Sequence, residues 1–395
     1  MAERTAGKSV EEQLKSYIHR LSLDFPDRFI GGKGHGKAFD YLQRTLRSWG
    51  LWVNVQPFTV DIHIPHKWSL EIDTGQGYEK VETLPGIGAP SIRRMESEIL
   101  PVGHAREEDY ESLDDTEGKV HLTMLWKSHE TTKIREAAMR GAPALIWYND
   151  YFDELYSGAC DYSLAPIPGF AIHKSVARRV IDAGGGRVRL HNRSKRRRIR
   201  CRNLEAGYGG DNGRHALLTA HYDTRPHTPG ASDDASGVAV MLAFIRAGYG
   251  RDLPVKVRYL FADCEEEGCV GAEQFAAQRY RANLLKATSC VVNLDAVGWP
   301  NLCVITRDRD AVMDNGLSRL ACDVLQDLGY TAERVRSKTG KSNHTPFAHR
   351  GVPSLWLSDY PNYIRHSIID NAFNVDYPTM SLVTESLRRI FLEMD

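Results

Sequence analysis

The stretch ALLTAHYDTRPHTPGASDDASGVAVMLAFIRAG, residues 216–248, contains the pattern that decides the fold. An apolar run ends in the polar triplet His221-Tyr222-Asp223, a loop follows, and a long apolar segment of helical character begins near Ser236. A strand that passes through a loop into a helix is the repeating unit of α/β proteins. Open sheets of this kind bind ligands at the carboxyl ends of their strands, so the polar triplet stands at a place suited to chemistry.

The same order recurs towards the C-terminus. Further strand-like runs are VKVRYLFAD (255–263), SCVVNLDAVG (289–298) and VPSLWLS (352–358), and further helical runs are GAEQFAAQRY (271–280), VMDNGLSRLACDVLQDLG (312–329) and SLVTESLRRIFLE (381–393). Apolar, β-branched strands joined to amphipathic helices predict a sheet covered by helices on both faces. We therefore predict an α/β fold of the three-layer αβα type with a mixed, mainly parallel central sheet.

The N-terminal and middle regions suggest a division of the chain. Residues 10–50 have helical periodicity that ends at Gly50, a typical helix C-terminus, and LWVNVQPFTVDI (51–62) alternates like a strand. From about Lys67 to Arg200 short strands alternate with short helices, which indicates a smaller unit. Because 395 residues exceed one ordinary core, we expect a catalytic domain formed by 1–66 and 201–395 and an insertion formed by 67–200.

Charge and composition limit the function classes. The 51 basic residues balance the 51 acidic ones, which argues against bulk electrostatic binding to nucleic acid or to an anionic membrane. The basic run RSKRRRIR (193–200) follows an alternating strand and lacks interleaved aromatic residues, so we expect a solvated connector there. No apolar run is long enough to span a membrane.

The N-terminus and the cysteines bear on location. The first 15 residues are polar and lack the apolar stretch of a secretory signal. The seven cysteines are an odd number without C-x-x-C pairs, which favours buried thiols in a reducing compartment. We therefore expect a cytoplasmic protein.

Acidic and histidine side chains gather where the predicted strands end. Each motif alone is weak evidence, because acidic residues at strand ends often only cap helices or face solvent. Together they are informative, since carboxylates clustered at one sheet edge would repel one another by several kcal/mol without a cation between them. Two histidines and three carboxylates would suit one or two Zn²⁺ ions. The residues concerned are His221, Asp223, Asp233, Asp234, Glu265, Glu266, Glu267, Asp295, His366 and Asp370.

Read in order, five motifs resemble the co-catalytic zinc aminopeptidase family, which includes bacterial leucyl aminopeptidases, glutamate carboxypeptidase II, glutaminyl cyclase and the transferrin receptor ectodomain. They are H-x-D (221–223), D-D-A-S-G (233–237), E-E-x-G-x-x-G (265–271), N-L-D-x-x-G (293–298) and H-x-x-x-D (366–370). The resemblance covers about 201–395. The middle segment also resembles a protease-associated domain, through the strand–helix–strand order of residues 118–150.

The resemblance implies a role for each residue that matches a motif. Glu265 would be the general base, and Asp223 would hydrogen-bond His221 and so fix its tautomer. Asp370 would serve His366 in a related way, whereas Asp234 and Glu267 are expected to cap a helix or face solvent. Two zinc ions per chain are implied, with His221 and Asp295 on one, Glu266 and His366 on the other, and Asp233 between them.

Two departures from the family pattern concern the substrate. The residue before the last metal histidine is often Tyr in the family but is Arg365 here, with Tyr363 two residues earlier, which leaves the oxyanion donor open. The segment S-D-H-x-P-F has Asn343 at the Asp position, and Lys341 precedes it. Lys341, Tyr363 and Arg365 are therefore candidate substrate-binding residues.

The resemblance implies an aminopeptidase that acts on short peptides or on a peptide-like amide. A metallocarboxypeptidase of the glutamate carboxypeptidase type shares the metal shell, and Lys341 and Arg365 keep that alternative open. A non-catalytic receptor-like binding module would have lost ligands that this chain retains, and a single-zinc cyclase would not need the full paired set. We expect a peptide substrate, neither nucleic acid nor membrane as partner, and a fold compatible with a homo-oligomer.

Overall fold

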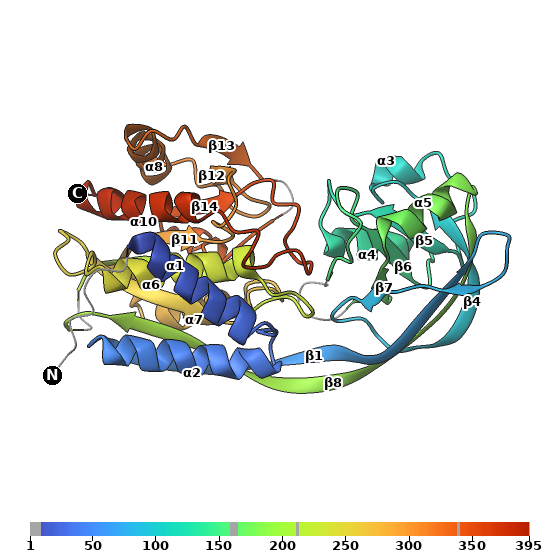
Figure 1. Ribbon diagram of the computed structural model, residues 1–395, viewed down its shortest axis with the longest axis horizontal. Coiled ribbons are helices and arrows are strands. Elements are labelled where there is room, and N and C mark those ends of the chain that lie inside the picture. The colour runs from blue at the N-terminus through green and yellow to red at the C-terminus, as the bar shows by residue number, and fades with distance from the viewer. Residues whose placement is uncertain (1–8, 159–164, 211–212, 338–339, 395) are drawn as a thin grey trace. The chain divides into compact units, whose positions relative to one another are not determined.

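The computed structural model describes residues 9–158, 165–210, 213–337 and 340–394 (Figure 1). The chain forms two compact units. The first contains residues up to Phe58, Arg200–Arg365 and Ile369–Asp395, and the second contains Thr59–Ile199 with the short segment His366–Ile368. Among the described helices, none combines the length and apolar character needed to cross a membrane.

The first unit is built on a mixed sheet. Its strands run in the order β13-β12-β14-β11-β9-β10-β8. The pairs β9–β10, β9–β11, β11–β14 and β12–β13 are parallel, whereas β12–β14 and β8–β10 are antiparallel. This arrangement confirms the predicted mixed, mainly parallel sheet. The bounds are β8 Gly186–Gly207, β9 His215–His221, β10 Lys256–Ala262, β11 Thr288–Leu294, β12 Leu302–Arg307, β13 Glu333–Arg336 and β14 Ser354–Asp359.

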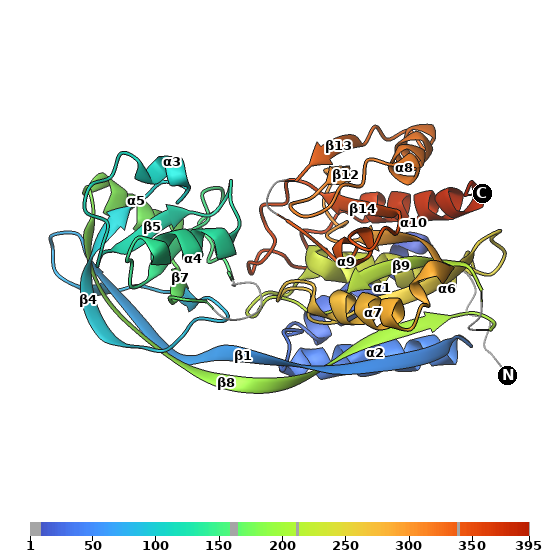
Figure 2. The same cartoon turned by 180° about the vertical axis from the view of Figure 1, so that it is seen from behind.

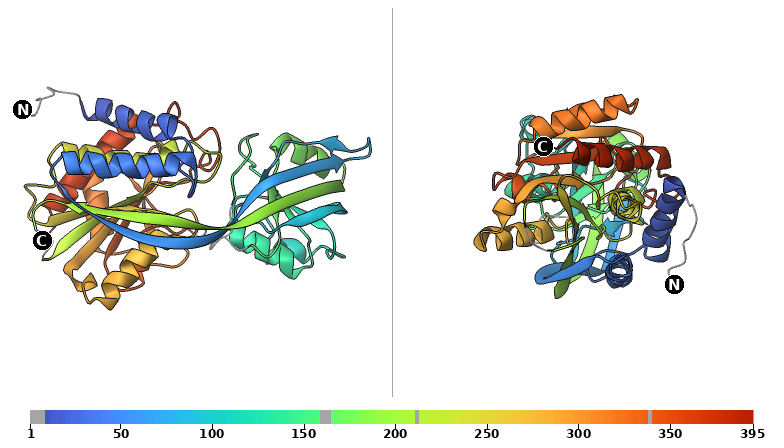
Figure 3. Two further views of the ribbon diagram at one scale, coloured as in Figure 1. Left: turned by 90° about the horizontal axis from the view of Figure 1, so that it is seen from below. Right: turned by 90° about the vertical axis from the view of Figure 1, so that its left-hand side faces the viewer.

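Helices cover both faces of this sheet. Side chains alternate between the faces, so that Leu218 packs into the larger core and its neighbour Leu217 into a second core on the other side. On the first face lie α1 Val10–His19, α2 Lys33–Ser48, α6 Gly237–Arg246, α8 Gly316–Asp327 and α10 Tyr377–Leu392 (Figures 1 and 3). On the second lie α7 Val270–Arg281 and α9 Thr345–Ala348 (Figure 2).

The second unit is a smaller α/β structure. Its core strands follow the order β8-β4-β5-β6-β7-β3, and β5 and β6 are parallel and joined by α4, as the strand–helix–strand pattern predicts. Helix α5 packs against the face that carries Ile146, and α4 against the face that carries Leu145. The bounds are β2 Glu79–Lys80, β3 Leu84–Pro85, β4 Ile92–Pro101, α3 Glu107–Tyr110, β5 Val120–Met124, α4 Glu130–Met139, β6 Leu145–Tyr148, β7 Gly169–Ala171 and α5 Lys174–Asp182.

Strand β1, Trp52–Asp73, pairs with β8, and Figure 3 shows the two strands side by side. Each of these strands contains one of the two predicted domain boundaries, 66/67 in β1 and 200/201 in β8. The basic run 193–200 belongs to β8, so the prediction of a connector without regular structure was wrong. Most side chains of this run are exposed, as expected. Of the six cysteines in the described ranges, five are buried and Cys322 is half-buried, as predicted. Cys160 lies outside the described residues.

Candidate metal centre

The strands of the first unit deliver the predicted site residues to one edge of the sheet. His221 is the last residue of β9, Glu265 and Glu266 follow β10 in a turn, and Asp295 directly follows β11. Because β10 and β11 both pair in parallel with β9, which lies between them, the carboxyl ends of the three strands lie at the same edge. Asp233 lies in the irregular helical segment Ala231–Ser236 that leads into α6.

Two groups of side chains in this region could each hold a metal ion. His221, Asp233 and Asp295 form one, and Asp233, Glu266 and His366 form the other. Within each group the candidate ligand atoms lie within 4.8 Å of one another, and all of these side chains are buried. Asp233 belongs to both groups.

The electrostatic environment of His221 is suited to a cation. Its Nδ1–H donates to the carbonyl oxygen of Asp223 (3.2 Å), which leaves Nε2 facing carboxylate oxygens of Asp233 (3.1 Å), Glu265 (3.9 Å) and Asp295 (3.9 Å). Burial lowers the pKa of His221, but Glu265 and its neighbours outweigh burial and raise that pKa well above its usual value. Burial and the nearby carboxylates likewise raise the pKa of Glu265. Such a set of buried anions fits metal ions.

The carboxylate of Asp223 hydrogen-bonds the turn after β10 and lies farther from the ring of His221. Its two carboxylate oxygens accept hydrogen bonds from the main-chain N–H groups of Glu265 (3.1 Å) and Glu266 (3.2 Å). Its Oδ1 lies 3.5 Å from Nδ1 of His221, farther than its own carbonyl oxygen. The expected carboxylate–histidine contact is therefore secondary, and the carboxylate mainly orients the residues of the Glu pair.

The contacts of three acidic neighbours differ from, or narrow, the roles expected for them. Asp370 accepts from the N–H groups of Ser232 (2.6 Å) and Asp233 (3.1 Å), and so holds the segment of Asp233 rather than His366. Asp234 is fully buried and accepts from the N–H groups of His221, Gly237 and Ala296, which is capping of α6 without solvent exposure. Glu267 is also buried, so it does not face solvent, which was one of the two roles expected for it.

Other side chains support the cluster through contacts that the sequence motifs do not reveal. The hydroxyl of Ser342 donates to Oδ2 of Asp295, and the Asn293 amide donates to that hydroxyl (2.8 Å). Arg225 makes an ion pair with Glu266 (2.8 Å). The thiol of Cys269 donates to Oε1 of Glu265 (3.2 Å). Apart from the Cys269 contact, these contacts join residues remote in sequence, which pattern analysis of one chain cannot pair.

Two further contacts involve residues that the sequence patterns do not single out. Within the second unit, Nδ1 of His366 lies 2.8 Å from the hydroxyl of Tyr156. Within the first, His35 of α2 lies 2.7 Å from Asp263, the residue that directly follows β10. Both histidines are buried. A helix pattern shows that a position faces the core, but it does not reveal a polar partner there.

The three candidate substrate residues are all half-buried. Lys341 directly precedes Ser342, the residue bonded to Asp295. Tyr363 and Arg365 lie in the loop after β14, where the side chain of Asn362 accepts the N–H of Arg365 (3.3 Å) and donates to Ser232 (2.9 Å).

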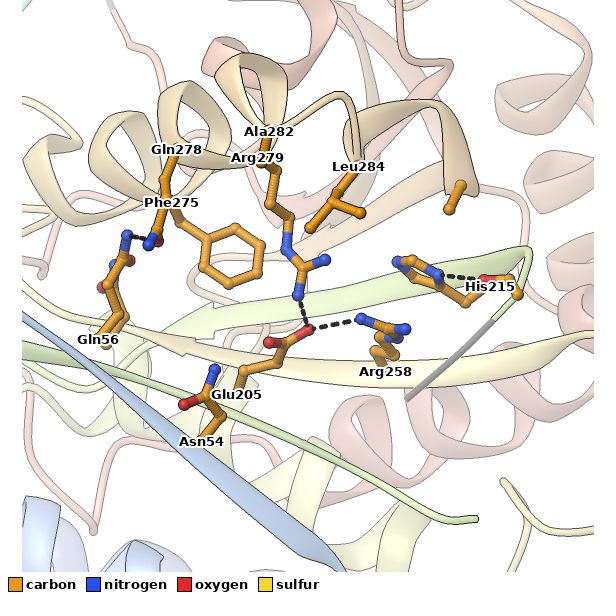
Figure 4. A pocket seen from close by; sticks show the side chains of 13 residues that line it. Asn54, Gln56, Glu205, His215, Arg258, Phe275, Gln278, Arg279, Ala282 and Leu284 are labelled. Carbon is orange, nitrogen blue, oxygen red and sulfur yellow. Dashed lines mark hydrogen bonds and ion pairs between the residues drawn. The ribbon is translucent and has the colours of Figure 1, made fainter. Parts of the chain in front are cut away.

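A separate cavity of about 490 Å³ opens at the opposite ends of the strands (Figure 4). His215 and Arg258, near the starts of β9 and β10, line it together with Glu205, Phe275 and Arg279. Glu205 accepts from both arginines. The charged side chains that line the cavity are thus paired with one another. The cavity lies at the opposite ends of β9 and β10 from the clustered carboxylates.

Comparison with known proteins agrees with these features. Residues 203–390 match peptidase family M28. The chain is 27% identical to a probable leucine aminopeptidase 2 of Aspergillus oryzae, over 83% of this chain and 68% of that protein. It is 24% identical to aminopeptidase YwaD of Bacillus subtilis, over 86% and 73%. The fold is similar to that of BSAP, a zinc aminopeptidase from Bacillus subtilis, with a TM-score of 0.74, 20% identity, and coverage of 96% and 94%.

Proposed function

Because the chain belongs to peptidase family M28 and is a zinc-dependent aminopeptidase, we propose that it removes the N-terminal residue of short peptides or of a peptide-like amide. Two zinc ions would be held by the clustered side chains at the carboxyl edge of the sheet. In this proposal His221 and Asp295 hold one ion, Glu266 and His366 the other, and Asp233 both.

One observation carries the ligand assignment. Five buried side chains form two groups that share Asp233, with all ligand atoms of a group within 4.8 Å. His221 Nε2 has no hydrogen-bond partner among the described residues, and its nearest charged neighbours are carboxylates. An imidazole nitrogen beside carboxylates, which would lose its proton when a metal ion binds, matches the ligands that Zn²⁺ prefers.

Zinc ions held by these residues would make a water molecule more acidic and polarise the substrate carbonyl. The proton of that water would pass to Glu265 and then to the departing amine. Three contacts prepare Glu265 for this role. Its main-chain N–H is held by Asp223, its Oε1 accepts from Cys269, and its Oε2 is directed towards the cluster, 3.9 Å from His221 Nε2.

For the substrate, we propose contacts from Lys341, Tyr363 and Arg365. Tyr363 is the candidate oxyanion donor, because a phenol hydroxyl can stabilise charge that develops on the carbonyl oxygen. Hydrolysis of amino-acid anilides should be compared with hydrolysis of the same compounds blocked at the amine. Cleavage only of the free amines supports the aminopeptidase assignment. Equal cleavage of N-blocked peptides with a free C-terminal carboxylate would favour a carboxypeptidase instead.

The proposal also covers the inserted domain, the cellular location and the partners of the chain. We propose that residues 67–200 form a protease-associated insertion, supported by the parallel β5-α4-β6 arrangement. The six free cysteines of the described ranges support a cytoplasmic location. A balanced charge supports a peptide substrate rather than nucleic acid or membrane, and Arg196 and Arg198 of the basic run pair with Asp61. Self-association is compatible with this proposal.

A further inference from the structure

Arg28 is a fully buried arginine in the segment between α1 and α2, with 0% of its surface exposed. Its guanidinium donates to four main-chain carbonyl oxygens. Nε donates to Tyr222 (2.9 Å), Nη1 to Leu21 (2.6 Å) and Pro229 (2.9 Å), and Nη2 to Gly230 (2.7 Å). A planar guanidinium with fixed donor directions can satisfy several carbonyls at once, which an ammonium cannot do in the same geometry.

The carbonyls of Tyr222 and Gly230 belong to the segments that carry two proposed metal ligands. Tyr222 directly follows His221, and Gly230 stands three residues before Asp233. Arg28 therefore ties the end of β9 to the start of the segment Ala231–Ser236. The approach at Gly230 is close, because a Cβ there would lie 3.0 Å from Nη2 of Arg28 and 2.5 Å from the carbonyl oxygen of Asp233.

The charge of Arg28 also suits its surroundings. Burial lowers the pKa of Arg28 to about 10, opposed by Asp370, Asp223, Asp234 and Asp233, so the side chain stays a cation at neutral pH. A buried cation needs hydrogen-bonded, anionic surroundings to offset its desolvation. Here the four carbonyls supply the hydrogen bonds and the acidic residues of the cluster supply the charge.

We propose that Arg28 is a positioning residue of the metal centre, which fixes the spacing between the segments of His221 and Asp233 so that both reach the same ion. This inference rests on the proposed ligand set. It predicts that shortening or removing the guanidinium weakens metal binding even in a chain that still folds. Supporting contacts of this kind commonly change metal affinity by about 10- to 100-fold.

The test compares Arg28→Lys and Arg28→Gln with Arg258→Lys. Arg258 is a matched control, because it is also a buried arginine of the first unit but pairs with Glu205 at the far end of β10. For each metal-free variant, chemical denaturation gives the free energy of unfolding. Competition with a chromogenic chelator then gives zinc affinity, and the visible spectrum of the Co²⁺ form reports ligand geometry.

We expect Arg28→Lys to weaken at least one zinc site by about 10-fold or more and to alter the Co²⁺ spectrum. Arg258→Lys should retain both affinities and the wild-type spectrum, even where its loss of stability is similar. Wild-type affinity and spectrum in Arg28→Lys would overturn the inference, as would equal losses in Arg258→Lys. Failure of both Arg28 variants to fold in saturating zinc would assign Arg28 to the fold as a whole and also overturn it. A wild-type chain that binds no zinc would instead overturn the proposed function.

Discussion

Nε2 of His221 lies 3.1 Å from Oδ1 of Asp233, and both side chains are buried. The other ring nitrogen of His221 donates to a main-chain carbonyl, so Nε2 presents its lone pair to the carboxylate unless a proton or a cation lies between them. Asp295 and Glu265 add further negative charge within 3.9 Å. This relationship is the basis of the metal proposal.

Removal of metal should destabilise the first unit, because the clustered carboxylates then repel one another. A ligand present at about 1,000 times its Kd stabilises a folded protein by about 4 kcal/mol. Thermal unfolding of the zinc-loaded chain should therefore shift to lower temperature with a strong chelator and return when zinc is added back. An unfolding temperature that does not respond to the chelator would contradict the presence of metal in the folded centre.

Glu265→Gln should retain both metal ions and lose turnover by about 10²- to 10⁴-fold, because the amide cannot accept the proton of the attacking water. Metal content by mass spectrometry and the rate on an amino-acid anilide measure the two effects separately. Glu273→Gln is the control, since Glu273 lies on α7 in an exposed ion pair with Arg350. Near-normal turnover by a metal-loaded Glu265→Gln chain would remove Glu265 from the mechanism.

Ser342→Ala should weaken zinc binding by about 10- to 100-fold, because the hydroxyl that donates to Asp295 is lost. Ser289→Ala is a matched control, because Ser289 also donates through its hydroxyl but bonds the carbonyl oxygen of His215 near the start of β9. Zinc titration against a competing chelator measures both variants. If both variants bind zinc as tightly as the wild type, Ser342 does not orient Asp295 for metal binding.

Lys133 should make stability depend on pH. Its ammonium is buried in α4 and donates to the carbonyl oxygen of His104, and burial lowers its pKa from 10.5 to about 7. Between these pH values the unfolded chain binds the proton and the folded chain does not. The free energy of unfolding should therefore rise with pH from about 7 towards 10, by at most about 1.4 kcal/mol per pH unit.

Chemical denaturation at pH 7, 8 and 9 tests this dependence. Lys133→Met should lose the contribution, whereas Lys80→Met, at an exposed lysine of the same unit, should keep the wild-type slope. Identical slopes in the wild type and Lys133→Met would show that the ammonium stays charged when buried.

The sequence predicts the fold well because its strands are strongly apolar and its helices periodic. The parallel strands β9, β10 and β11 lie where the apolar runs indicate, and the residues that follow them converge as expected. The basic run 193–200 is the exception among the elements. Its charges favour a solvated connector, yet pairing with neighbouring strands holds it extended within β8.

The supporting contacts could not be predicted, because they depend on three-dimensional proximity. Asp370 lies four residues after His366 in a family-like motif, but its carboxylate reaches the N–H groups of Ser232 and Asp233. Nothing distinguishes Arg28 in sequence from an exposed arginine, and its burial depends on four carbonyls, three of them about 200 positions away. A motif identifies the residue types at a site, whereas the partners of each residue come from the fold.

The zinc stoichiometry of the purified chain tests the proposed metal centre directly. It is measured by mass spectrometry after saturation with zinc and removal of loosely bound metal. Two zinc ions are expected per wild-type chain and fewer in Asp233→Ala, because Asp233 belongs to both groups of candidate ligands. A wild-type chain without tightly bound zinc, or an Asp233→Ala chain that still holds two ions, would contradict the proposed metal centre.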